Sequence, residues 1–231
     1  MKPTPQEIAV IEQLKQNERA EKIRRYKNLN RMARKGQILF CGSSLMEQFP
    51  VHELMMDLDE MPLAIYNRGM GGYTTKELAE KLDTLIFDLE PAHIFINIGT
   101  NDLNEEQFDL NGLLGRYDMI LTRIRERLPQ ANIYVMAYYP CNPQVVADSG
   151  WAHIFQHRTN ERVRAANDAI QALSQKHQAQ FLDLNEGITD ETGNLKEDYT
   201  IDGVHIFGEG YMKVFEALLP ILREINQNGR A

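Results

Sequence analysis

The sequence predicts one α/β domain in which helices cover both faces of a parallel sheet. From residue 37 onward, short apolar runs alternate with longer stretches of helical periodicity. The length of 231 residues suits a single hydrophobic core. Such alternation is typical of parallel strands joined by right-handed crossovers, so we expect a three-layer α/β/α sandwich.

Five apolar runs are the strand candidates, and longer periodic segments are the helix candidates. The strands are expected at residues 38–41, 63–67, 93–97, 132–137 and 179–183. The helices are expected at residues 45–57, 75–88, 105–127, 158–177 and 211–225. Thr74 and Glu77 have the spacing of a capping box, which marks the start of the second of these helices.

Residues 1–36 are predicted to form a helical extension ahead of the main domain, which spans 37–231. Thr4, Pro5 and Glu7 form a capping box with proline at the first helical position. The first 35 residues hold ten Lys and Arg against four Glu, although the whole chain has a net charge of −8. A solvated helix face is the expected role, and contact with an anionic lipid surface is the alternative.

Composition excludes several classes of partner. A net charge of −8 argues against nucleic acid as a partner. No run approaches the roughly 18 apolar residues of a membrane span, so stable membrane insertion is not expected. Two cysteines and no apolar secretory signal in the first twenty residues predict a cytoplasmic location. A homodimer is left open.

Three loops carry residues with chemical potential, and each follows a predicted strand. They are Gly42–Ser44, Arg68–Gly72 and Gly99–Asp102. In parallel sheets ligands bind beyond the carboxyl ends of the strands. We therefore expect the functional site at this edge.

Ser44 is a candidate nucleophile because it lies between a strand and a helix, near free backbone N–H groups. An N-cap serine is the structural alternative. Asp202 and His205 can share a hydrogen bond that leaves the second imidazole nitrogen free as a base. Gly72, through its N–H, and Asn101, through its amide, are candidate oxyanion donors, although both residue types are also common in turns.

These fragments together resemble the GDSL or SGNH hydrolase family of esterases and lipases. Gly42–Leu45 is similar to the family's first block, and Asn67–Thr74 to its second. Gly99–Asp102 is similar to the third block, and Asp202–His205 to the fifth. The resemblance covers about residues 37 to 225, and the glycine block looks closest to bacterial relatives of platelet-activating-factor acetylhydrolase.

The resemblance implies a flavodoxin-like sheet with strand order 2-1-3-4-5 and a role for each site residue. It implies that Ser44 is the nucleophile and that Asp202 and His205 activate it. It also implies an oxyanion hole formed by Ser44, Gly72 and Asn101, with no cofactor. Ser43 stands where the family usually has aspartate, and we expect its hydroxyl to bond to the loop.

The expected activity is hydrolysis of small or short-acyl carboxylic esters. A carbohydrate O-deacetylase with the same machinery is the first alternative, and a non-catalytic ligand-binding module of this fold is the second. A flavodoxin-like cofactor binder is disfavoured, because the chain has neither G-x-G-x-x-G nor a Walker loop.

The remaining signals are weaker. Trp151 and Phe155 lie in a segment rich in Pro and Gly and could form a substrate wall. Arg68 could meet an anionic substrate group, although pairing with a nearby carboxylate is the preferred interpretation. His153 and His157 lack a third ligand, so no metal is expected. Cys41 and Cys141 are expected to be packing residues rather than a disulfide.

Overall fold

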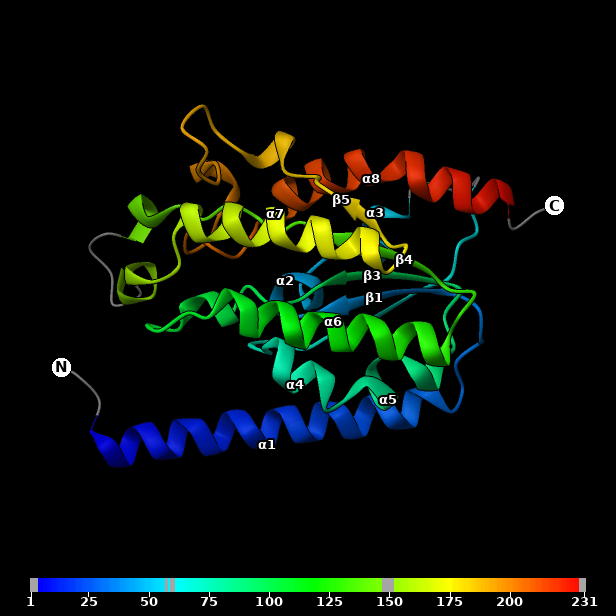
Figure 1. Ribbon diagram of the computed structural model, residues 1–231, viewed down its shortest axis with the longest axis horizontal. Coiled ribbons are helices and arrows are strands. Elements are labelled where there is room, and N and C mark those ends of the chain that lie inside the picture. Colours follow the sequence, from blue (N-terminus) through cyan, green and yellow to red (C-terminus); the bar gives the residue numbers. More distant parts are fainter. Residues whose placement is uncertain (1–3, 57, 59–60, 147–151, 229–231) are drawn as a thin grey trace.

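The protein forms a five-stranded parallel sheet between two helical layers (Figure 1). The computed structural model describes residues 4–56, 58, 61–146 and 152–228. The strands are Ile38–Gly42 (β1), Ile65–Gly69 (β2), His93–Asn97 (β3), Asn132–Met136 (β4) and Gln180–Leu182 (β5). Their order is β2-β1-β3-β4-β5, which confirms the predicted topology.

Alternate residues of each strand enter two separate cores. On β1, Leu39 and Cys41 join the core on one face, whereas Ile38 and Phe40 join the core on the other. The first core is covered by Thr75–Ala79 (α4), Leu82–Leu85 (α5), Leu110–Arg127 (α6) and Asn160–Lys176 (α7). The second is covered by Ser44–Glu47 (α2), Val51–Leu54 (α3) and Gly208–Asn228 (α8).

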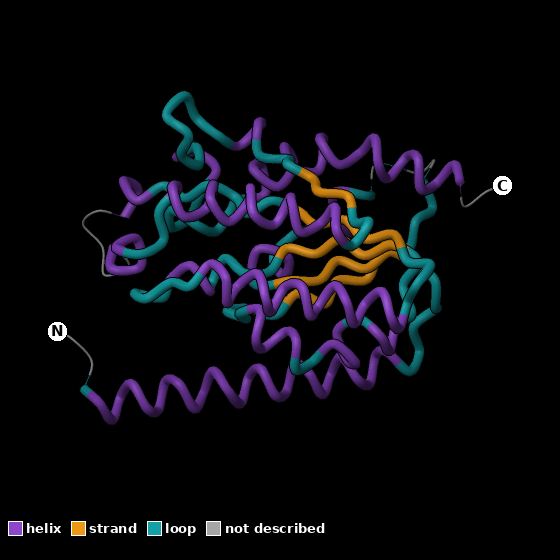
Figure 2. Tube along the Cα trace, in the orientation of Figure 1, coloured by secondary structure: helices purple, strands orange, loops and turns teal. Residues whose placement is uncertain are grey.

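The N-terminal segment is one long helix, α1 (Pro5–Asn30), that lies outside the first layer (Figure 2). Its capping box at Thr4 and Glu7 is present, and so is the second box at Thr74 and Glu77. The carboxyl half of α1 packs against α5 and adds Tyr26 to the first core. Its amino-terminal part runs beyond α4 in Figure 1. The domain division at residue 36 stays a prediction.

Two of the predicted helices are broken. In place of the helix predicted at 45–57 the structure has α2 and α3, with Pro50 as the N-cap of α3. Proline cannot donate a backbone hydrogen bond inside a helix, which accounts for the break. Residues 75–88 form α4, α5 and a 3₁₀ turn, although no proline or glycine marks the break at Lys81. The second strand is also displaced by two residues from its expected position, which moves Arg68 into the strand.

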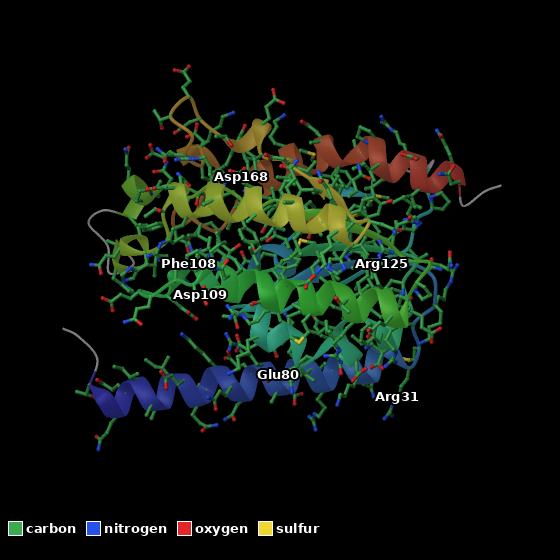
Figure 3. All side chains as sticks on the ribbon, viewed as in Figure 1. Arg31, Glu80, Phe108, Asp109, Arg125 and Asp168 are labelled. Carbon is green, nitrogen blue, oxygen red and sulfur yellow. The ribbon has the colours of Figure 1, made fainter. Side chains whose placement is uncertain are left out.

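Helix α6 runs along the direction of the strands, so its two ends lie near the carboxyl and the amino ends of the strands (Figure 3). Phe108 and Asp109 lie at its amino-terminal end, near the carboxyl edge of the sheet. Arg125 lies near its other end, where it donates to the carbonyl oxygens of His177 (2.8 Å) and Ala131 (2.6 Å). These bonds hold α6 and the end of α7 together away from the chemically unusual loops.

Candidate active site

A cavity of about 270 Å³ lies at the carboxyl edge of the sheet. Its lining includes all five residues that the sequence predicts for catalysis and the oxyanion hole. They are Ser44, Gly72, Asn101, Asp202 and His205. Parallel strand direction explains why Ser44, Gly72 and Asn101 converge, because β1, β2 and β3 end at the same edge and each continues into the loop that carries one of them. Asp202 and His205 come from the segment between β5 and α8.

Ser44 is placed by a close approach of two strand ends. It is the first residue of α2, directly after Ser43 and the last β1 residue, Gly42. A Cβ atom at Gly42 would lie 2.0 Å from the carbonyl oxygen of Asn97, at the end of β3. Only glycine tolerates this approach, so the packing between β1 and β3 accounts for glycine at position 42.

Ser44, His205 and Asp202 form a continuous chain of hydrogen bonds. The Oγ atom of Ser44 lies 2.9 Å from Nε2 of His205. Nδ1 of His205 lies 2.7 Å from Oδ2 of Asp202. The arrangement leaves Nε2 as the imidazole nitrogen that faces the serine hydroxyl, as a general base must.

The Asp202 carboxylate is held by more than the imidazole. Its Oδ1 accepts the backbone N–H groups of His205 (2.8 Å) and Val204 (3.0 Å). Burial alone would raise the pKa of Asp202, but the side-chain and backbone hydrogen bonds from His205 outweigh it and lower the pKa to about 2. The carboxylate is therefore ionised throughout the neutral range.

Three donors face the cavity beside this chain. Among the described residues, no backbone acceptor is bound to the N–H groups of Ser44 and Gly72. Gly72 has φ +71°, and a Cβ there would lie 2.3 Å from Nη2 of Arg19. Nδ2 of Asn101 donates one hydrogen bond to the carbonyl oxygen of Tyr73 (3.0 Å), which leaves its second N–H for another acceptor.

The Ser43 hydroxyl differs from expectation. Its Oγ is buried without a hydrogen-bond partner among the described residues, so the predicted bond to the loop is wrong. The backbone of Ser43 is fully used, because its N–H donates to Asn97 and its carbonyl accepts from Met46 and Glu47. The loop is held by its main chain, and the short hydroxyl reaches no acceptor.

Comparison with known proteins identifies the family. The model of the GDSL-like lipase/acylhydrolase family matches residues 49–213. The chain belongs to this family. The matched segment contains Gly72, Asn101, Asp202 and His205 and begins five residues after Ser44. As a GDSL-like family member, the chain is a carboxylic ester hydrolase.

Relatives of this GDSL-like hydrolase agree with the assignment. Platelet-activating factor acetylhydrolase IB subunit alpha1 of Bos taurus is 26% identical over 189 residues, which cover 80% of this chain and 75% of the relative. A structure from Streptococcus pneumonia named for platelet activating factor is 28% identical, with a TM-score of 0.85, covering 95% of this chain and all of that one. An acetylxylan esterase of Geobacillus stearothermophilus shares the fold, with 16% identity, a TM-score of 0.62 and coverage of 82% and 95%.

The weaker substrate-binding predictions fare differently. Arg68 is buried and donates to Oδ1 of Asn30 from Nε and Nη2, both at 3.0 Å. It therefore faces α1 rather than the cavity, which corrects both the substrate role and the carboxylate pairing. Phe155 lies against Gly203, and its neighbour Ile154 lines the cavity instead. Trp151 lies outside the described residues.

Further polar residues of the cavity escaped the sequence analysis. Lys15 of α1, Asn104 and Arg158 all line it. Arg158 is only 4% exposed. The sequence contains no pattern that singles out these three residues, because each comes from an element that reaches the site only through tertiary packing. Arg158 merely marked the start of a predicted helix.

Metal and membrane features can be assessed only for the described part of the chain. There, no group of three or more His, Cys, Asp or Glu side chains could hold a metal ion. None of the described helices has the length and apolar content needed to cross a membrane. Cys41 and Cys141 are free and buried, as predicted for packing residues.

Proposed function

We propose that this GDSL-like hydrolase is a serine esterase that cleaves small or short-acyl carboxylic esters through an acyl-Ser44 intermediate. The observation that supports it most is the hydrogen-bonded chain from Ser44 through His205 to Asp202 at the cavity. The base lies within hydrogen-bond reach of the nucleophile on one side and of the orienting carboxylate on the other, which is what nucleophilic catalysis by serine requires.

In the first half-reaction Ser44 attacks the ester. His205 takes the hydroxyl proton at Nε2 while Oγ forms a bond to the carbonyl carbon. The ionised Asp202 stabilises the imidazolium that results. When the tetrahedral species collapses, its bond to the alkoxy oxygen breaks, and His205 returns the proton to the departing alcohol.

In the second half-reaction water replaces the alcohol. His205 removes a proton from water as the oxygen bonds to the acyl carbon of Ser44. Collapse then breaks the acyl bond to Oγ, the proton returns to Ser44, and the carboxylic acid leaves. No redox or group-transfer partner besides water enters this sequence.

The oxyanion of both tetrahedral species would be held by three donors. These are the N–H groups of Ser44 and Gly72 and the free N–H of the Asn101 amide. Such donors stabilise the transition state more than the ground state because the charge develops only on attack. Loss of one typically costs about 2.7–4 kcal/mol of transition-state stabilisation.

The cavity supports a small substrate. Its volume of about 270 Å³ lies below the roughly 300–1,000 Å³ of pockets that enclose drug-sized ligands. Leu45, Ile154 and Val204 supply apolar walls beside the nucleophile. We therefore expect acetyl and other short acyl groups to be preferred, which agrees with relatives named platelet-activating factor acetylhydrolase.

The test is hydrolysis of p-nitrophenyl acetate, butyrate and octanoate by the wild type and by Ser44→Ala. We expect rates that fall with acyl length and a loss of activity in the variant. Equal rates in the two proteins would remove Ser44 as nucleophile. Mass spectrometry of the enzyme quenched during turnover should show an acetyl group on the peptide containing Ser44.

A carbohydrate O-deacetylase is the second candidate. The polar side chains of Lys15 and Asn104 in the cavity favour it, since sugar hydroxyls need hydrogen-bond partners. Acetate release from acetylated xylooligosaccharides, compared with acetylated phospholipids, distinguishes the two. Membership of an ester-hydrolase family argues against the non-catalytic module.

Two further predictions accompany this function. A cytoplasmic location is inferred from cysteine usage, and the two free thiols support it. A homodimer stays open, and the mass of the protein in solution tests it.

A further inference from the structure

Arg158 is a buried cation beside the oxyanion donors. It precedes α7, is 4% exposed and lines the cavity. Its hydrogen bonds with described residues go to neutral oxygens: Nε donates to Oδ1 of Asn104 (2.8 Å), and Nη2 donates to the Thr100 carbonyl oxygen and to Oδ1 of Asn101 (both 3.1 Å). Because these acceptors are uncharged, they satisfy the N–H groups of the buried guanidinium without neutralising its positive charge.

The Asn101 amide is held between two groups of opposite hydrogen-bonding character. Arg158 can only donate, and it contacts Oδ1. The carbonyl oxygen of Tyr73 can only accept, and it contacts Nδ2. Rotating the amide by 180° would place donor against donor and acceptor against acceptor. Both contacts therefore select the same orientation of Asn101.

We propose that Arg158 is a positioning residue of the oxyanion hole, which orients the Asn101 amide and polarises its N–H groups. A charged donor on Oδ1 draws electron density from the amide, so Nδ2–H becomes a stronger donor to a developing oxyanion. This inference rests on the proposed esterase function. It assigns to Arg158 an effect on kcat exerted through Asn101, without contact with the substrate.

The electrostatic surroundings fit this role. Burial lowers the pKa of Arg158, and Cys141 and Asp202 act through space in the opposite direction. The net result is a pKa of about 10. The guanidinium is thus protonated at neutral pH despite its burial. Asp202 is ionised under the same conditions, and its charge is already engaged by His205.

The test is a double-mutant cycle with Arg158→Met and Asn101→Ala, measured on p-nitrophenyl acetate. Removal of an oxyanion donor in Asn101→Ala should lower kcat by roughly 10²–10³-fold. Arg158→Met should lower kcat by roughly 10- to 100-fold with KM changed by less than about threefold. In the Asn101→Ala background, the same Arg158→Met change should cost less than about threefold more.

Arg162→Met is the matched control. Arg162 also donates to carbonyl oxygens of the segment that follows Asn101, those of Leu103 (3.3 Å) and Glu105 (2.8 Å), but its hydrogen bonds with the described residues do not include Asn101. It should keep kcat within about twofold, as expected for a change that leaves the site intact. Arg158→Lys retains the charge without the planar fork and should recover about tenfold over Arg158→Met.

Each outcome decides the inference. Equal loss from Arg158→Met in both backgrounds would mean that Arg158 acts independently of Asn101. A rise in KM alone would make it a substrate contact, and either result overturns the proposal. If Arg158→Met does not fold by circular dichroism, the cycle is run with Arg158→Gln, which also removes the charge, under the same criteria. Equal rates of ester hydrolysis in the wild type and in Ser44→Ala would instead refute the esterase proposal itself.

Discussion

The side chains of the site differ in how firmly the backbone holds them. Asp202 accepts two backbone N–H groups and the imidazole, all from residues within three positions of it. This local arrangement can be predicted from an Asp-x-x-His spacing. The 2.9 Å contact from His205 to Ser44 joins residues 161 positions apart, so it depends on the whole fold.

Asp202 gives a prediction about stability and pH. Because its folded pKa of about 2 lies below the unfolded value of about 3.9, ionised Asp202 stabilises the fold above pH 4, and this contribution is lost as the pH falls toward 2. Asp202→Asn should therefore lower the free energy of unfolding relative to wild type at pH 5–7. The difference should shrink at pH 3.

Urea unfolding at pH 3, 5 and 7 measures this difference. Asp168→Asn, at an exposed carboxylate of α7 labelled in Figure 3, is the control for the loss of one surface charge. A gap between wild type and Asp202→Asn that widens below pH 4 would contradict the assignment.

At the scale of elements, α1 is attached through a few buried polar contacts. Asn30 donates to the Thr84 carbonyl oxygen (2.7 Å) and accepts two bonds from Arg68. The Tyr26 hydroxyl donates to the Gly69 carbonyl oxygen at the end of β2 (3.1 Å). The amino half has exposed apolar residues instead, with Ile11 45% and Leu14 56% exposed. Basic residues of the carboxyl half also attach the helix, as Arg19 does through its ion pair with Glu77.

Substitution of Asn30 should therefore destabilise the protein. Asn30→Ala removes the acceptor of a buried guanidinium, and we expect a loss of about 2–3 kcal/mol in the free energy of unfolding. Asn17→Ala is the control, because Asn17 lies on the exposed part of the same helix and its side chain accepts a hydrogen bond from Gln13 of that helix. It should change the free energy by less than about 0.5 kcal/mol. Equal effects in urea titrations would show that Asn30 does not anchor α1.

At the scale of the whole molecule, the cavity joins segments that are distant in the chain. The first helix contributes Lys15, the turn before α7 contributes Ile154, and the loop before α8 contributes Val204. No single element determines its size. We therefore expect the proposed acyl selectivity to depend on the assembled fold.

Ile154→Ala should widen the acyl preference. Removing the side chain enlarges a cavity wall, and a methylene in an apolar pocket is worth about 1–3 kcal/mol in discrimination. We expect the ratio of kcat/KM for butyrate to that for acetate to rise at least about fivefold. Ile201→Ala is the control, since Ile201 is 53% exposed and does not line the cavity. An unchanged ratio in Ile154→Ala would place the acyl group elsewhere.

Local patterns were enough to predict much of this protein. Alternating periodicity identified all five strands, and both capping boxes lie where Thr4 and Thr74 indicated. Short motifs identified the five candidate catalytic and oxyanion residues of the cavity, because Gly-Ser-Ser and Asp-x-x-His each span only a few positions of the chain. These features depend on residues a few positions apart, which a sequence displays directly.

Only the tertiary structure decided the rest. It turned Arg68 toward Asn30 and left the Ser43 hydroxyl without a partner among the described residues. It also brought Arg158 to Asn101, 57 positions earlier in the chain. The direction of a side chain depends on which elements pack around it, and that packing is shared across the molecule. Local sequence therefore determined the strands, the caps and the candidate reacting residues, whereas the orientation of the side chains was decided by the assembled core.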